Sequence, residues 1–456
     1  MEKRANFGSK LGIVLASAGS AVGLGNVWRF PTEVGTNGGA AFILIYVLCV
    51  VVLGLPLMVS EFVIGRHTHK NTADAYRGLA PHSPWIFQGY LGVFTAWFIL
   101  CYYGVVSGWT LKYLLSGTVG ELNRMTDSAA YFTSFSSSVW EPIIYMVIVM
   151  LMCHFVIVRG VQSGIERFSK LMMPMLLLII ALLVIFSFSM PGSADGLRFL
   201  LKPDFSKITS SVVLSAMGQA FFSLSIAMGC LCTYASYFTD DARLMKTAGS
   251  VAAIDTTVAI MSGFIIFPAV FSVEEVAPDA GPGLVFITLP NVFQIAFGNV
   301  PWLGWIFSVL FYLLLLLAAL TSMMSIHEPP TAFLLEHFNM KRCTATTIVT
   351  AVCIGIGVLC SLSFGLLSDC KPLFGMTFFD FFDFVSAKIF LPVGGIIISL
   401  FVGWRLDCEM VYGELSNHGH QNVPRWTFRI FIFLLRWLIP LAIIGIFLKE
   451  LGLFAN

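Results

Sequence analysis

The run LGIVLASAGSAVGLGNVW at residues 11–28 contains no Asp, Glu, Lys or Arg. A membrane-spanning helix needs about 20 mostly apolar residues, so this run is long enough to cross a bilayer. Its centre, Gly19–Asn26 (GSAVGLGN), is a poor helix former because it holds three glycines. Each glycine costs an interior helical position about 1 kcal/mol relative to alanine. The run therefore predicts a membrane-spanning segment whose helix is interrupted near its middle.

The rest of the chain is equally apolar. It has 456 residues, of which 57% are hydrophobic and 11% are charged, with a mean hydropathy of +0.87. Ordinary soluble domains carry about 25% charged residues, so too little polar surface is present to cover a globule in water. The 26 Lys and Arg nearly balance the 25 Asp and Glu, which argues against a nucleic-acid partner. The composition predicts an all-α polytopic membrane protein, with the lipid bilayer as its main partner.

Eleven segments have the length and apolarity of a membrane span. With the N-terminus inside, sixteen Lys and Arg fall on the inner side of the membrane and seven on the outer side. This asymmetry follows the positive-inside rule and favours an N-terminus in the cytoplasm. The predicted spans are residues 10–33, 39–65, 85–115, 140–158, 165–190, 210–238, 245–272, 304–336, 344–365, 378–404 and 427–450.

A second interruption lies five spans after the first, at Ser223–Gly229 (SLSIAMG). Freed backbone groups in lipid cost several kcal/mol each unless they face protein or a cavity. Two interruptions at matching positions of two five-span halves indicate a binding site between inverted repeats. Close helix packing through small residues is the alternative interpretation.

The residues at these interruptions suggest which ligands the site would take. Helix N-termini offer free N–H groups that suit a carboxylate. Unwound carbonyls, with the side chains of Asn26, Ser223, Thr321 and Ser322, offer hard oxygen ligands for a small cation. No thiolate or imidazole cluster stands beside them in the sequence, so the predicted ions are Na⁺-like rather than transition metals.

Other classes of protein find little support. The sequence has no phosphate loop and no Gly-x-Ser-x-Gly elbow, and His327-Glu328 lacks the second histidine of a zinc protease motif. A channel is disfavoured because no charged ring or repeated carbonyl filter is evident. The connection at residues 273–303 contains Gly281-Pro282-Gly283 before an apolar stretch, which suits either a lid over an outer vestibule or a surface turn.

Four motifs together resemble the neurotransmitter:sodium symporters. They are GSAVGLGNVWRFP at 19–31, NGG at 37–39, GPGLVFITLP at 281–290 and AALTS at 318–322. The resemblance extends from about residue 4 to the last span. It implies one transporter domain over 1–456, with repeat one at about 10–190, repeat two at about 210–404, and spans one and six unwound. An eleven-span chain resembles the bacterial members that take up hydrophobic amino acids, which implies a multi-pass protein of the bacterial plasma (inner) membrane.

The resemblance implies a Na⁺-coupled symporter with two sodium sites and one substrate site. By the family pattern the first sodium site is Ala21, Asn26, Ser223 and Asp255, closed by the substrate carboxylate. The second sodium site is Gly19, Val22, Ala318, Thr321 and Ser322. The substrate-binding residues are Ser20, Ala21, Leu24, Gly25, Ile99, Tyr103, Phe222, Ser223, Ser225, Met228, Ser322 and Ile326.

Two positions depart from patterns within the family and refine the expected substrates. Asp255 stands where an Asn is usual, and it can supply the negative charge that chloride-dependent members borrow from the ion. An intramembrane carboxylate is costly and marks a functional site by default, so we predict chloride independence. One alternative is that Asp255 takes up a proton as the empty carrier returns, which would couple transport to protons. The other alternative is that Asp255 is purely structural. Gly23 replaces the Asp of monoamine carriers, which favours an L-amino acid, hydrophobic or aromatic, over an amine.

The resemblance also implies gates on both sides of the site. On the outer side Arg29 would pair with Asp383, or with Asp380 as the second choice. On the inner side Arg4 would pair with Glu336 near Tyr237, although a plain positive-inside anchor explains Arg4 equally well.

The spacing Gly164-x₉-Pro174 matches a helix-unwinding motif, with a passive kink as the alternative. Glu61 is expected to tie helix backbone to the core. A sensor that binds an amino acid without transporting it needs the same pocket and stays open, and no obligate protein partner is evident.

Overall fold

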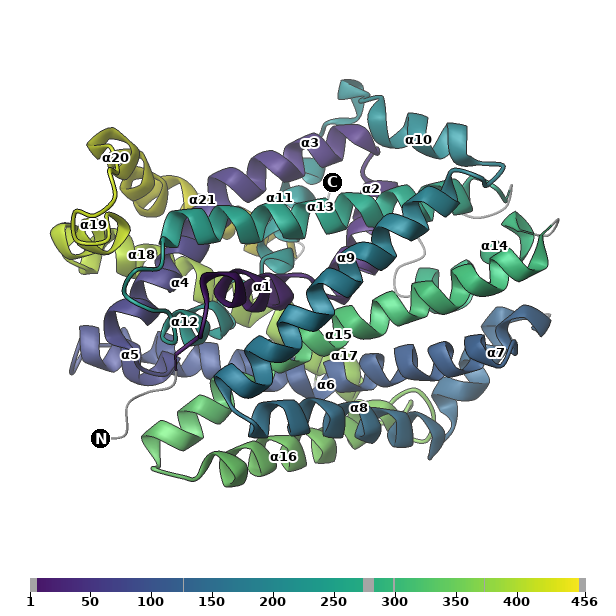
Figure 1. Cartoon of the computed structure of the whole chain (residues 1–456), viewed down its shortest axis with the longest axis horizontal. Helices are drawn as coiled ribbons and strands as arrows, with labels where there is room; N and C mark the ends of the chain where they lie inside the picture. The colour runs from purple at the N-terminus through teal and green to yellow at the C-terminus, as the bar shows by residue number, and fades with distance from the viewer. Residues whose placement is uncertain (1–5, 126, 274–282, 298–299, 373, 451–456) are drawn as a thin grey trace.

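The computed structural model describes residues 6–125, 127–273, 283–297, 300–372 and 374–450. Every regular element within these residues is helical. The long helices run from one end of the molecule to the other (Figure 1). The short helices α5 (Thr72–Leu79) and α19 (Cys408–Leu415) lie at one end, and α7 (Ser128–Ser137), α10 (Ser193–Leu201) and α14 (Leu289–Ala296) lie at the other.

Nine helices in the described residues are long and apolar enough to cross a membrane, and a bent pair brings the number to ten. Apolar side chains such as Leu44, Phe155 and Leu178 remain exposed on them, as expected for surfaces that face lipid. The nine are Ala40–Thr68 (α3, η2, α4), Ile86–Thr118 (α6), Glu141–Val158 (α8), Val161–Ser187 (η4, α9), Leu244–Val270 (α13), Pro301–His337 (α15), Arg342–Leu362 (α16), Phe378–Arg405 (α17, η7, α18, η8) and Arg425–Leu448 (α20, η9, α21).

The tenth candidate is the glycine-rich segment of the first predicted span. Helix α1 (Lys10–Ala21) stops at Ala21, and the chain resumes as the π-helical turn η1 (Gly25–Arg29) followed by α2 (Phe30–Thr36). The two parts are bent by 54°. Helix α1 is largely buried and packs against α9, α13 and α15, so the break lies inside the protein rather than in lipid.

The predicted span at 210–238 is not one helix. It consists of α11 (Ser210–Ser223) and the six-residue helix α12 (Cys230–Ala235), separated by the non-helical residues 224–229. Ser225 and Ala227 have positive φ angles of 53° and 67°, which side chains other than glycine rarely adopt. Each half is too short to cross a membrane alone, so length and composition do not establish eleven spans.

Glu61 of α4 holds the second break in place. Its fully buried carboxylate accepts hydrogen bonds from the backbone N–H of Ala227 at 2.6 Å and of Cys232 at 3.2 Å. Bonds to a charged group are each worth about 1.5–3 kcal/mol, so this carboxylate offsets the backbone bonds that a continuous helix would have made. The predicted role of Glu61 as a backbone tie is confirmed.

The apolar part of the 273–303 connection is packed into the protein. Residues 274–282, which include Gly281 and Pro282, lie outside the described residues. Beyond them, the turn η6 (Leu284–Thr288) buries Phe286 against Trp109. The hydroxyl of Tyr113 donates to the Phe286 carbonyl at 2.8 Å, and that of Tyr312 donates to the Val285 carbonyl at 2.9 Å. This stretch is therefore an inserted segment and not a simple surface turn.

Candidate functional site

The two helix breaks lie against each other and share hydrogen bonds. The Ser225 hydroxyl in the second break donates to the Ser20 carbonyl at the end of α1, at 2.8 Å. On the other side, the Leu24 backbone N–H donates to the hydroxyl of Tyr103, which projects from α6, at 3.1 Å. The structure therefore brings together three segments that are far apart in the sequence, with free backbone groups at their centre.

A buried acid joins four helices beside these breaks. Asp255 of α13 is fully buried, and its Oδ1 accepts a bond from the Asn26 amide at 2.7 Å. Its Oδ2 accepts bonds from the Ser223 hydroxyl at 2.8 Å and from the Tyr46 hydroxyl at 3.4 Å. The Asn26 side-chain oxygen in turn accepts the Gly23 N–H at 2.9 Å. Three of the predicted first-site residues thus form one network, and Tyr46 joins it.

The residues predicted for the second sodium site gather where α1 packs against α15. The Ser322 hydroxyl donates to the Val22 carbonyl at 3.1 Å, and the Thr321 hydroxyl donates to the Ala318 carbonyl at 3.0 Å. A methyl group placed on Gly19 would stand 3.3 Å from the Thr321 Cβ atom. All five residues therefore lie at the contact between α1 and α15.

Both groups of residues suit a hard cation. Their polar atoms are carbonyl, hydroxyl, amide and carboxylate oxygens, which are ligands for ions such as Na⁺. Within the described chain, no group of three or more His, Cys, Asp and Glu has a metal-binding arrangement. The oxygen-rich composition of the two groups fits the predicted ion type.

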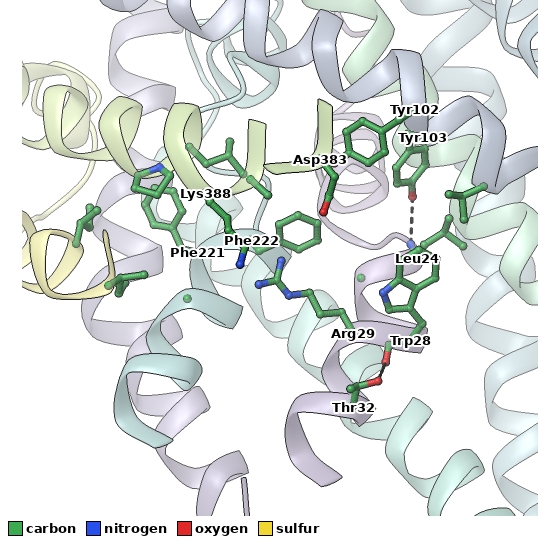
Figure 2. A pocket seen from close by; sticks show the side chains of 18 residues that line it. Leu24, Trp28, Arg29, Thr32, Tyr102, Tyr103, Phe221, Phe222, Asp383 and Lys388 are labelled. Atoms are coloured by element: carbon green, nitrogen blue, oxygen red, sulfur yellow. Dashed lines mark hydrogen bonds between the residues drawn. The ribbon is translucent and has the colours of Figure 1, made fainter. Parts of the chain in front are cut away.

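A large cavity opens next to the breaks (Figure 2). Its free space, part of which is open to solvent, is about 1250 Å³, and it is bounded by α6, α11, η1, the α17–α18 region and α21 (Ile439–Glu450). Of the twelve predicted substrate-binding residues, four line this cavity: Leu24, Gly25, Tyr103 and Phe222. The other eight are buried residues that do not line it. The Ser20 hydroxyl is buried with no hydrogen-bond partner in the described chain, which leaves it available to a ligand.

The predicted outer gate residues face this same cavity. Figure 2 shows Arg29, Asp383 and Lys388 pointing into it. The Arg29 guanidinium lies over the Phe222 ring, 4.4 Å from its centroid. Within the described residues, no carboxylate oxygen comes within 4.0 Å of Arg29, so the Arg29–Asp383 ion pair is not formed here. The carboxylate of Asp380, the second choice, instead accepts a bond from the Thr377 hydroxyl at 2.8 Å, and the Asp380 backbone N–H donates to the same hydroxyl at 3.3 Å.

The predicted inner gate is described only in part, because Arg4 lies outside the described residues. Glu336 accepts bonds from the backbone and side-chain amides of Asn71, at 2.7 and 2.9 Å. The Tyr237 hydroxyl donates to the fully buried Glu328 at 2.8 Å.

Sequence reasoning missed the strongest ion pair in this region. Both Glu328 oxygens pair with the Arg342 guanidinium, at 3.0 and 2.6 Å. An acid inside an apolar run was the available signal, but Glu328 was considered only as part of a zinc motif. His327, the neighbouring residue, bonds to Thr331 and Thr350, both at 2.9 Å, and so links α15 to α16.

The Gly164-x₉-Pro174 motif coincides with irregular helix. Gly164 lies in the π-helical turn η4 (Val161–Glu166), and Pro174 lies inside α9 (Arg167–Ser187). A methyl group on Gly164 would stand 2.1 Å from the Val156 carbonyl oxygen, so only glycine fits this position. The two residues of the motif therefore enclose the junction between a π-helical turn and an α-helix that contains a proline.

With this geometry described, comparison with known proteins identifies the family. The family model described as the sodium:neurotransmitter symporter family matches residues 4–135 and 122–454. The chain belongs to the sodium:neurotransmitter symporter family. The predicted family is thereby confirmed, together with a multi-pass membrane transporter rather than an enzyme.

Individual members of the symporter family match over nearly the whole chain. An uncharacterized sodium-dependent transporter of Bacillus subtilis, YhdH, is 38% identical over 456 residues, covering 99% of both chains. An uncharacterized sodium-dependent transporter of Haemophilus influenzae is 34% identical over 462 residues, again covering 99% of each. The crystal structure of MhsT in complex with L-phenylalanine superposes with a TM-score of 0.89 at 38% identity, covering 98% of this chain and 100% of that chain.

Proposed function

We propose that this member of the symporter family couples the Na⁺ gradient to uptake of a hydrophobic or aromatic L-amino acid, by alternating access and without chloride. The observation that carries the proposal is the buried Asn26–Ser223–Asp255 network, which joins both helix breaks to α13. It places a negative charge and several oxygen ligands beside free backbone groups. The sodium-dependent relatives and the L-phenylalanine bound to MhsT support the proposal.

Two sodium ions would travel with the substrate. The first would be held by Ala21, Asn26, Ser223 and Asp255, with the substrate carboxylate as a further ligand. The second would be held at the α1–α15 contact by Gly19, Val22, Ala318, Thr321 and Ser322. The first ion would thereby make substrate binding depend on Na⁺, because ion and carboxylate share one site.

The substrate would bind through both of its charged ends. Its carboxylate would meet the Tyr103 hydroxyl and the Leu24 and Gly25 amides, and its amine would meet carbonyls at Ala21 and Phe222 and the Ser225 hydroxyl. Its side chain would lie among Ile99, Phe222, Met228 and Ile326. Ile99 and Ile326 are rigid and apolar, whereas Met228 is a flexible filler that can repack around bulky side chains.

A carboxylate-bearing substrate follows from the space at Gly23. A Cβ atom there would stand 2.5 Å from the Ser322 hydroxyl and 3.1 Å from the Tyr103 hydroxyl. An acidic side chain of the monoamine-carrier type would have to displace one of these hydroxyls, which favours a ligand that brings its own carboxylate. This close packing supports an amino acid over an amine.

We expect equal initial uptake rates in chloride and in gluconate buffers of matched Na⁺ concentration. The Asp255 carboxylate already accepts the hydrogen bonds of Asn26, Ser223 and Tyr46, which are donors that a bound anion would need. The negative charge is therefore built into the protein. A several-fold stimulation by chloride would contradict this part of the proposal.

Transport requires the site to open to each side in turn. In the proposed arrangement two inverted repeats, about 10–190 and 210–404, are followed by an eleventh span at 427–450, with the N-terminus inside. The outer side would be closed by Arg29 and Asp383. The inner side would be closed by Arg4, Glu336 and Tyr237. Unwinding of the helix between Gly164 and Pro174 would admit water to the second sodium site. The open cavity between Arg29 and Asp383 supports an outer gate that is not joined in this conformation.

Counterflow in sealed proteoliposomes would test the proposal and identify the substrate. Each vesicle sample would be preloaded with one of the twenty common L-amino acids. The external buffer would contain the same amino acid in labelled form, with Na⁺ or K⁺ as the cation. We expect Na⁺-dependent exchange of hydrophobic and aromatic amino acids only. Tight Na⁺-dependent binding without exchange would instead identify a sensor.

A further inference from the structure

We propose that a groove where α19 and α20 meet the η8–η9 contact binds the phosphate group of an anionic phospholipid. The groove has about 600 Å³ of free space and is lined by Cys408, Arg429, Ile432, Phe433, Arg436 and Trp437, among others. The turns η8 (Phe401–Arg405) and η9 (Leu434–Leu438) contact each other, and the yellow-green C-terminal helices lie together at one end of the molecule (Figure 1). Its assignment to the cytoplasmic leaflet rests on the N-inside orientation proposed above.

Two arginines without an acidic partner face this groove. Arg429 and Arg436 are seven residues apart on one helix, which places them on the same face two turns apart. Within the described residues, neither has a carboxylate oxygen within 4.0 Å. By contrast, nearby Arg425 pairs with Glu409 at 2.9 Å. Cations near the apolar part of a membrane are costly when unpaired, so an external anion is the expected partner.

Arg436 is held in a fixed position by the neighbouring span. Its Nε donates to the Gly403 carbonyl at 2.5 Å, and its guanidinium carbon lies 5.2 Å from the centre of the Trp404 ring. The Trp404 indole N–H donates back to the Arg436 carbonyl at 3.3 Å. A second guanidinium nitrogen of Arg436 donates to the Cys408 Sγ atom at 3.6 Å. Of the five N–H groups of a guanidinium, this arrangement engages one with a backbone oxygen and one with the thiol, and it leaves three for a phosphate.

The groove borders the end of the Phe378–Arg405 candidate span, where we expect a membrane–water interface. Gly403 and Trp404 immediately precede the end of the Phe378–Arg405 span. Trp404 and Trp437 are 53% and 52% exposed, and their rings meet edge to face at 5.2 Å. Exposed tryptophans at the end of a span form the aromatic belt that sits among lipid headgroups. Arg429 is the fifth residue of the Arg425–Leu448 span, so a phosphate bound between Arg429 and Arg436 would stand near headgroup depth.

The surface beside the arginines favours a lipid over a free ion. Phe433, Leu438 and Leu441 are exposed apolar residues on the same helix, spread along its length toward the bilayer interior. An anionic head on Arg429 and Arg436 with acyl chains along these residues matches a phospholipid. Basic pockets between transmembrane helices on the cytoplasmic side bind such headgroups.

A second cationic groove provides a matched control. It is lined by Lys10, Arg243 and Lys246, but Lys10 is paired with Asp241 at 2.7 Å, and no aromatic ring borders it. Replacing Arg243 and Lys246 by glutamine changes the net charge by as much as replacing Arg429 and Arg436. The two double variants therefore separate a specific site from general charge attraction.

Native mass spectrometry of the purified full chain tests the proposal. The probes are dioleoyl phosphatidylglycerol, dioleoyl phosphatidylcholine and inorganic phosphate, each titrated in neutral detergent. We expect the parent protein to retain phosphatidylglycerol preferentially. The R429Q/R436Q variant should bind this lipid about tenfold or more weakly, which corresponds to a loss of about 1.4 kcal/mol of binding free energy. The R243Q/K246Q variant should bind it with little change in affinity. The single variant Arg429→Gln changes an exposed residue and should show part of the loss of phosphatidylglycerol binding. It keeps the test valid if variants with Arg436→Gln do not fold.

Three results would overturn the proposal. They are equal weakening by both double variants, equal retention of phosphatidylcholine, or displacement of the lipid by inorganic phosphate at lipid-like concentrations. Na⁺-dependent amino-acid binding is measured on the same samples. Because that readout depends on the sites at the helix breaks, failure of the proposed function would leave the lipid result unaffected.

Discussion

Replacement of Asp255 by alanine is expected to lower Na⁺-driven uptake of L-phenylalanine by about 100-fold or more, equivalent to about 2.7 kcal/mol. Asp255 is the one acid among the predicted ligands of both sodium sites, and it is fully buried. Its removal would take away the ion's charged ligand and leave the donors of Asn26, Ser223 and Tyr46 without their acceptor. Breaking such a buried charged network costs about 3–5 kcal/mol.

Initial rates in proteoliposomes, normalised to folded protein, measure this effect. Asp255→Asn keeps the shape and removes the charge, so it should be nearly as defective as the alanine variant. Tyr46→Phe removes only the longest bond, at 3.4 Å, and should retain most of the activity. A well-folded Asp255→Asn protein with near-normal Na⁺ dependence would show that the charge of Asp255 is not required for Na⁺ binding.

The second large effect is expected from one methyl group at the first helix break. Gly23→Ala should weaken Na⁺-dependent L-phenylalanine binding by about 100-fold. The added Cβ would stand 2.5 Å from the Ser322 hydroxyl and 3.1 Å from the Tyr103 hydroxyl, so one of these side chains must move. Tyr103 is the predicted carboxylate ligand and Ser322 belongs to the second sodium site, so either movement damages binding.

Gly249→Ala is the matched control for this substitution. Gly249 lies within α13, and a methyl group there would meet no atom within 4 Å. Alanine is a better helix former than glycine by about 1 kcal/mol, so this variant should bind normally and be at least as stable as the parent. Equilibrium binding of labelled L-phenylalanine to the purified proteins compares them. Normal binding by Gly23→Ala would mean that the carboxylate does not lie at this break.

Much of this structure was predictable because glycine and charge are strong local signals. The three glycines of Gly19–Asn26 predicted a break, and the chain bends by 54° there. The small residues of Ser223–Gly229 likewise fall on the non-helical stretch between α11 and α12. Asn26, Ser223 and Asp255 were expected together from the family pattern, in which Asp255 differs from the usual Asn.

Other features depend on contacts that no local pattern reveals. Tyr46 reaches Asp255 from another span, and a tyrosine in an apolar run is no signal by itself. The Glu328–Arg342 pair joins two consecutive helices, and its geometry appears only after they pack. The Arg29–Asp383 pairing was expected from the family resemblance, but the Arg29 guanidinium lies over the Phe222 ring instead. Gate contacts change with conformation, so a single sequence pattern cannot state which are formed.

Concentrative uptake is the most direct test of Na⁺-coupled amino-acid transport. Purified protein in sealed vesicles would receive labelled L-phenylalanine with an inward Na⁺ gradient, and internal label would be followed before and after a sodium ionophore. We predict accumulation above the external concentration only with the gradient, and its release when the ionophore collapses it. Equilibration to the external concentration regardless of Na⁺, or binding with no internal label, would contradict a sodium-coupled symporter.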